Sequence, residues 1–129
     1  LLFNPALAPF DANFPEVDAL QHLTNDFAPA IVFFGTEDKK WLAGWGAAHT
    51  KLKDLGAGER INLWLAEGAG HSFFGKKPWF NHVLIETDRF LVSQGLLSSK
   101  ATQKMTPGDK RLIKTKNVDS SSKVEKQTP

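Results

Sequence analysis

Residues 30–38 read Ala-Ile-Val-Phe-Phe-Gly-Thr-Glu-Asp, an unbroken apolar run that ends at a glycine and is soon followed by two acidic residues. The run contains β-branched and aromatic side chains, which favour strands. Because no polar residue alternates within it, the run is typical of a strand that is buried on both faces of a parallel sheet. We therefore expect an α/β fold with residues 30–34 near its centre.

The residues after this strand alternate between helical and strand patterns. A helix is predicted by apolar residues with helical spacing that stop before Gly56: Trp41, Trp45, Ala48, Leu52 and Leu55. Residues 61–65, Ile-Asn-Leu-Trp-Leu, predict a second strand. After Pro78, a second helical face ends before Gly95: Phe80, Val83, Leu84, Thr87 and Leu91. This order predicts a βαβα arrangement and a mostly parallel sheet.

The first residues also look like part of a sheet. Leu1-Leu2-Phe3 stops at Asn4-Pro5, which is how a buried strand ends. Prolines 9, 15 and 29 predict a loop over residues 6–29, with one helical turn near residues 17–23. Two strands buried on both faces need further neighbours. We therefore expect residues 1–97 to be the C-terminal portion of a larger α/β domain whose N-terminal part is missing.

The charges divide the chain near residue 97. Residues 1–97 hold 8 Lys and Arg against 11 Asp and Glu, and residues 98–129 hold 8 against 3, so the net charge of +2 combines −3 with +5. The second segment has no Phe or Trp, and we expect a basic, disordered tail over residues 98–129. It lacks an Arg cluster with interleaved aromatic residues, so no nucleic-acid partner is expected.

Composition argues against two other classes of protein. A membrane span needs ~18 consecutive apolar residues, and no apolar run here approaches that length, so no membrane span is expected. The 129 residues include no Cys, so the fold does not depend on disulfides, and the cellular compartment stays open.

Polar residues follow both predicted strands. Glu37 and Asp38 come after the first strand, and His71 ends the glycine-rich residues 66–71 after the second. Neighbouring parallel strands end at the same edge of a sheet, so we expect the two loops to meet. A carboxylate that accepts the Nδ1 proton of an imidazole orients the ring and leaves Nε2 to take a proton, which predicts Asp38 and His71 as acid and base of a catalytic triad. The alternatives are Glu37 as the acid, Asp38 as a helix N-cap, and His71 as an ordinary loop histidine.

These motifs resemble a known family. Residues 1–97 are similar to the C-terminal portion of an α/β-hydrolase of the esterase and lipase group, which includes acetyl esterases and acetylxylan or feruloyl esterase-like proteins. The resemblance rests on LLFNP (1–5), PAIVFFGTED (29–38), INLWLAEGAGHSFF (61–74) and the helix ETDRFLVSQGLL (86–97). Asp38 precedes His71, as the acid precedes the base in this fold. The resemblance implies a serine hydrolase for small-molecule carboxylic esters, with Asp38 and His71 as catalytic residues and no cofactor.

The sequence contains no G-x-S-x-G motif for the nucleophile. We therefore expect the nucleophilic serine to lie upstream and these 129 residues alone to be inactive. The nearest rival is a serine peptidase of the prolyl-oligopeptidase kind, and another is a hydrolase-derived binding domain without catalysis. Glu67, His71 and His82 lack the spacing of known metal ligands, so no metal site is expected. The histidines other than His71, namely His22, His49 and His82, are expected on the surface or on helix faces.

Overall fold

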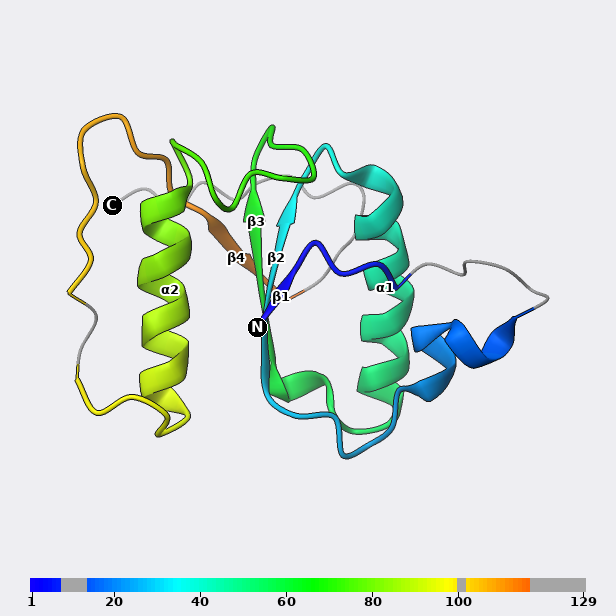
Figure 1. The fold of residues 1–129 in the computed structure, drawn as a ribbon. Coiled ribbons are helices and arrows are strands. Elements are labelled where there is room, and N and C mark those ends of the chain that lie inside the picture. The colour runs from blue at the N-terminus through cyan, green and yellow to red at the C-terminus, as the bar shows by residue number, and fades with distance from the viewer. Residues whose placement is uncertain (8–13, 100–101, 117–129) are drawn as a thin grey trace.

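The computed structural model describes residues 1–7, 14–99 and 102–116. Within these ranges one sheet has the strand order β1-β2-β3-β4, with β1 at Leu2–Phe3, β2 at Ala30–Gly35, β3 at Ile61–Ala66 and β4 at Ile113–Thr115. The first three strands run parallel, and β4 pairs antiparallel with β3. The sheet is therefore mixed but mostly parallel (Figure 1).

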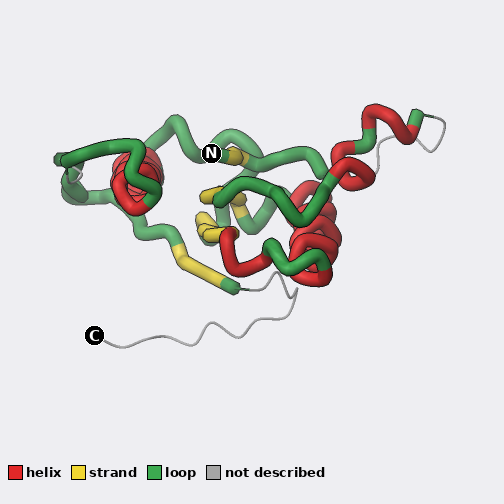
Figure 2. The backbone as a smooth tube through the Cα atoms, turned by 90° about the horizontal axis from the view of Figure 1, so that it is seen from below, coloured by secondary structure: helices red, strands yellow, loops and turns green. Residues whose placement is uncertain are grey.

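Two long helices cover the sheet. α1 spans Lys39–Asp54 and connects β2 to β3, and α2 spans Phe80–Ser93 and follows β3. Seen along their axes, the helices stand on opposite sides of the strands (Figure 2). Short 3₁₀ helices occupy Pro15–Val17, Ala19–His22 and Gly58–Arg60. The expected α/β fold with a βαβα order is confirmed, and the helical turn expected near residues 17–23 is the 3₁₀ helix at Ala19–His22.

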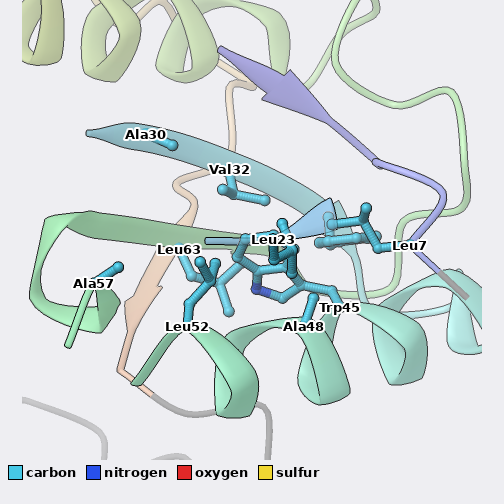
Figure 3. Packing of buried hydrophobic residues seen from close by; sticks show 10 residues of the cluster. Leu7, Leu23, Ala30, Val32, Trp45, Ala48, Leu52, Ala57 and Leu63 are labelled. Atoms are coloured by element: carbon cyan, nitrogen blue, oxygen red, sulfur yellow. The ribbon is translucent and has the colours of Figure 1, made fainter. Parts of the chain in front are cut away.

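The β2 strand is buried along its whole length because the helices cover both of its faces. Ala30, Val32 and Phe34 pack in one core with α1 residues that include Trp45 and Leu52 (Figure 3). The intervening residues of β2, Ile31 and Phe33, point to the opposite face of the sheet. There they belong to a second core, on the α2 side, that also contains Val83 and Phe90 of α2. Successive side chains of a strand point to opposite faces, so burial of both faces requires an uninterrupted apolar sequence.

The short strand β1 lies along the edge of β2 that faces away from β3. Leu2 of β1 pairs with Val32, and Phe3 pairs with Phe33. The rings of Phe3 and Phe33 stack with centroids 5.3 Å apart. The strand expected from the first three residues therefore exists as Leu2–Phe3, but it is not the buried strand that the apolar run indicated, because Leu2 is only half-buried and Phe3 is exposed.

Residues 102–116 differ from the disordered tail expected from residue 98 onward. Ile113–Thr115 form β4, which pairs with Leu63, Trp64 and Leu65 of β3, and Leu112 is buried in the α2-side core. The backbone N–H of Lys110 also donates to the carbonyl oxygen of Pro78 at 2.9 Å. This corrects the sequence prediction for residues 102–116, whereas residues 100, 101 and 117–129 lie outside the described part of the chain.

Polar side chains also hold the same stretch to α2. Asn81 on α2 is buried, donates through Nδ2 to Asp109 Oδ2 at 2.7 Å, and accepts through Oδ1 from Gln103 Nε2 at 2.7 Å. Asp109 Oδ2 also accepts from the backbone N–H and hydroxyl of Thr106. The hydrogen bond from Asn81 and those from Thr106 lower the pKa of Asp109, because they favour its charged form. The apolar periodicity of the sequence does not indicate such a hydrogen-bonded network.

His49 and His82 lie on helices, and both are buried. The sequence predicts surface or helix-face positions for them and does not indicate their burial. His49 on α1 stacks on Trp45, and His82 on α2 accepts through Nδ1 from the Leu112 backbone N–H at 2.6 Å. Burial lowers the pKa of both imidazoles because it disfavours their charged forms. Glu86, whose Oε1 lies 3.2 Å from His82 Nε2, opposes this shift in the pKa of His82. Neutral His82 therefore has a hydrogen-bond partner at each ring nitrogen.

We expect the free energy of unfolding to fall as the pH drops below about 6.5, the ordinary pKa of histidine. There the unfolded chain takes up protons that buried His49 and His82 resist in the fold, so protons favour unfolding. Each histidine contributes a slope of at most about 1.4 kcal/mol per pH unit. Urea titrations at a series of pH values measure this slope. His49→Phe should flatten it and the exposed His22→Phe should not, whereas a wild-type profile flat from neutral to mildly acidic pH would contradict the expectation.

Candidate functional site

The loops at the carboxyl ends of β2 and β3 are fastened to each other by hydrogen bonds. The Thr36 N–H donates to the Ala66 carbonyl oxygen at 3.0 Å, and the Glu37 N–H donates to that of Ala69 at 2.9 Å. In return, the Gly68 N–H donates to the Thr36 hydroxyl oxygen at 2.8 Å. The loops that carry the acidic residues and His71 therefore meet as the sequence predicts, at the edge of the sheet where α/β folds collect functional residues.

Gly35, the last residue of β2, permits this close approach. A Cβ at this position would overlap the carbonyl oxygens of Ala69 and Gly70 and would lie 2.6 Å from the Ala69 carbonyl carbon. These obstacles are backbone atoms of the loop that carries His71, so they cannot rotate away as a flexible side chain can. The missing side chain therefore sets the distance between the two loops.

We expect Gly35→Ala to lower the free energy of unfolding by about 1–3 kcal/mol, the usual cost of overpacking. The added methyl group must displace the loop at Ala69 and Gly70, or displace β2 from the core. Urea unfolding of the variant measures this loss. Gly75→Ala is the matched control, because a Cβ there meets nothing within 4 Å and its backbone needs no positive φ. Equal stabilities for these two variants would contradict the role assigned to Gly35.

Asp38 and His71 are in direct contact. Asp38 Oδ2 lies 2.7 Å from His71 Nδ1. The carboxyl side chain is only 10% exposed, whereas the imidazole is 56% exposed. Thus the carboxyl group of Asp38 is largely enclosed, and the imidazole ring of His71 that contacts it reaches the surface. The fold brings the two residues together across 33 positions of the sequence.

The alternative roles of the acidic residues can be compared with this geometry. Asp38 occupies the N-cap position of α1, but its side chain makes no capping hydrogen bond. Its carboxylate nevertheless lies at the positive end of the α1 dipole, which stabilises negative charge. Glu37 instead pairs with Lys39 at 3.5 Å, and both of these side chains are largely exposed. Of the two acids, Asp38 is the one in contact with His71.

This contact determines which ring nitrogen of His71 is available. When Nδ1–H donates to the Asp38 carboxylate, the neutral ring carries its lone pair on Nε2. No side chain or backbone group in the described part of the chain hydrogen-bonds to Nε2. The arrangement can therefore accept a proton at Nε2 and stabilise the resulting imidazolium through the carboxylate.

Asn4, at the end of β1, links this site to the edge strand. Its Oδ1 accepts from the Gly35 N–H at 3.3 Å, and its Nδ2 donates to the backbone carbonyl oxygen of His71. The residue is buried and has a φ of 43°, a left-handed conformation that Asn tolerates better than most residues. The sequence pattern indicates Asn4-Pro5 only as the end of a strand. An Asn directly before a Pro at a strand end was the available signal, but it does not identify the partners.

Aromatic packing fixes the loop that follows His71. Phe73 is buried and meets Trp79 edge to face, with ring centroids 6.4 Å apart. Phe74 packs on Phe3 of β1, with centroids 4.9 Å apart. His71 is thus an exposed side chain on a loop whose next residues are anchored in the core, which limits the positions that the ring can take.

The other histidines lie outside this site. His22 is exposed and contacts the carbonyl oxygen of Glu16, while His49 and His82 are buried in helices as described above. Over residues 1–7, 14–99 and 102–116, no three His, Cys, Asp or Glu side chains gather as a metal site would require. Among the same residues, no helix combines the length and the apolarity of a membrane-spanning segment.

Comparison of the chain with known protein families, with curated proteins and with solved structures gives no match. The structure of the described residues is a small α/β domain with a mostly parallel sheet of four strands.

Proposed function

We propose that Asp38 and His71 are the acid and the base of a serine hydrolase that cleaves carboxylic esters. The observation that carries the proposal is the 2.7 Å contact between Asp38 Oδ2 and His71 Nδ1 at the carboxyl ends of two neighbouring parallel strands. A largely enclosed carboxylate behind an exposed imidazole is the pairing that activates a hydroxyl nucleophile. The choice of esters as substrates follows from the resemblance of the sequence to esterases.

In the proposed reaction, His71 Nε2 takes the proton from a serine hydroxyl as its oxygen attacks the acyl carbon. The Asp38 carboxylate stabilises the imidazolium that forms. The imidazolium then gives its proton to the departing alkoxide, which leaves as an alcohol, and an acyl-serine remains. In the second half, His71 takes a proton from water, the hydroxide oxygen attacks the acyl carbon, and the serine recovers its proton as the carboxylic acid departs. No cofactor enters these steps.

The proposal requires a nucleophile from outside these 129 residues, because the sequence has no G-x-S-x-G motif. The outer edge of β1 supports this requirement. Within the described part of the chain no strand pairs with that edge, and the Phe3 side chain of β1 is 37% exposed. An open strand edge with exposed apolar side chains is suited to pair with a further strand. We propose that the segment bearing the serine continues the sheet at β1.

Activity assays of two forms of the protein test this proposal. We expect the 129 residues alone to hydrolyse p-nitrophenyl acetate no faster than free imidazole at the same concentration, because they lack the serine nucleophile. The full-length protein should hydrolyse the ester with turnover and leave peptide amides intact. Ester turnover by the 129 residues that depends on His71 would contradict the external nucleophile. Preference for an amide substrate would favour a peptidase, and no activity towards either would favour a binding domain.

A further inference from the structure

A cavity lies between α2 and the C-terminal stretch that follows residue 101. Its volume is about 610 Å³, within the range of sites that bind small molecules. On α2 it is lined by His82, Ile85, Arg89 and Val92, and on the C-terminal stretch by Gln103, Lys104, Met105 and Arg111. None of these residues belongs to the loops that carry Asp38 and His71, so the cavity is separate from the proposed catalytic site.

The charged groups that line the cavity are of one sign. Arg89, Lys104 and Arg111 contribute cations, and no Asp or Glu is among the described residues that line the cavity. Arg89 is partly neutralised by Glu86, whose Oε1 lies 2.6 Å from Arg89 Nη1. Lys104 and Arg111 have no ion-pair partner within the described part of the chain. The positive potential is also felt by His82, since Arg111 and Arg89 add to the effect of burial in lowering its pKa.

The rest of the wall is largely apolar. Ile85 and Val92 on α2 and Met105 opposite them offer aliphatic or thioether surface between the cations. Of the polar lining residues, Gln103 is already engaged with Asn81, and His82 with Leu112 and Glu86. An occupant must therefore bring a negative charge for Arg111 and Lys104 and an aliphatic body for the remaining surface. Guanidinium matches the two oxygens of a carboxylate or phosphate through paired hydrogen bonds.

We propose that the cavity between α2 and residues 103–111 binds an organic anion with a short aliphatic chain, with its carboxylate or phosphate group on Arg111 and Lys104. Binding would also join α2 to the C-terminal stretch, because one ligand contacts both. The proposal does not depend on catalysis by His71, so it stands or fails separately from the proposed function.

Calorimetric titration of the intact protein with four matched probes tests the proposal. Octanoate and octyl phosphate carry the two candidate head groups, while octanol and octylammonium keep the chain and remove or reverse the charge. We expect at least one anion to bind with a Kd below about 1 mM, and the neutral and cationic probes to bind at least about 10-fold more weakly. The anion that binds more tightly identifies the head group. Similar binding of all four probes, or no binding of either anion at about 10 mM, would overturn the proposal.

Variants locate the bound anion. Arg111→Gln should weaken binding of the preferred anion about 10-fold. Lys116→Gln removes an equal charge from the same stretch but outside the cavity wall, and should change the affinity less than about 2-fold. Both side chains are exposed, so neither change should unfold the protein, and thermal unfolding verifies this. Equal losses in the two variants would show that only net charge matters and would overturn the site. Shifts of the Ile85 and Met105 methyl NMR signals should accompany binding, and their absence would likewise contradict the location.

Discussion

Replacement of His71 by alanine in the full-length protein is expected to lower kcat for ester hydrolysis by at least about 10⁴-fold. Without the imidazole, the serine hydroxyl has no base within reach, and the leaving alkoxide has no proton donor. The fold should survive, because the His71 side chain is 56% exposed and, within the described part of the chain, hydrogen-bonds to Asp38 alone. The KM should change far less than kcat, since the base acts on the reacting atoms.

His22→Ala provides the matched control for this measurement. His22 is also an exposed histidine, but it lies on the 3₁₀ helix Ala19–His22, where its Nε2 is 3.0 Å from the Glu16 carbonyl oxygen. Its loss should leave kcat within about 2-fold of the wild-type value, as a surface substitution does. Retention of most activity by the His71 variant, or an equal loss in the two variants, would refute the assignment of His71 as the base.

Asp38→Asn should lower kcat by about 10³- to 10⁴-fold without unfolding the protein. The amide has nearly the shape of the carboxylate but can donate to Nδ1, which favours the tautomer with the proton on Nε2. That tautomer cannot accept the serine proton, and an amide cannot balance the charge of an imidazolium. Because Asp38 makes no side-chain cap to α1, the helix loses no capping hydrogen bond.

Glu37→Gln distinguishes the two acids that follow β2. Glu37 is exposed and pairs with Lys39, and such surface ion pairs contribute little to stability. The variant should therefore keep both activity and fold. If Glu37→Gln loses more activity than Asp38→Asn, the acid has been assigned to the wrong residue.

The parts of the fold that sequence reasoning predicts are those whose burial leaves a periodic pattern. Continuous burial of β2 requires the apolar run at residues 30–34, and α1 shows its core face through residues such as Trp45 and Leu52. The meeting of Asp38 and His71 could be anticipated for a related reason, because neighbouring parallel strands end at one edge. Topology thus brings together residues that no local pattern connects.

The parts that were not predicted depend on single polar contacts. β4 is three residues long and lies among basic residues, so its sequence carries no strand signal. Its approach to the sheet depends on partners such as the Asn81 amide and the His82 ring, which sequence alone cannot pair with Asp109 and Leu112. The link from Asn4 to the His71 loop is of the same kind, since it needs both a left-handed backbone and a buried amide side chain at Asn4.

The most direct test of the account is fluorophosphonate labelling of the full-length protein, read by mass spectrometry of its peptides. A fluorophosphonate reacts far faster with a serine that a neighbouring base has activated than with an ordinary serine. We predict one labelled serine outside these 129 residues, and loss of labelling in both His71→Ala and Asp38→Asn but not in His22→Ala or Glu37→Gln. Absence of labelling in the wild-type protein, or labelling that is undiminished in the His71→Ala variant, would contradict the role of Asp38 and His71 as a catalytic acid and base.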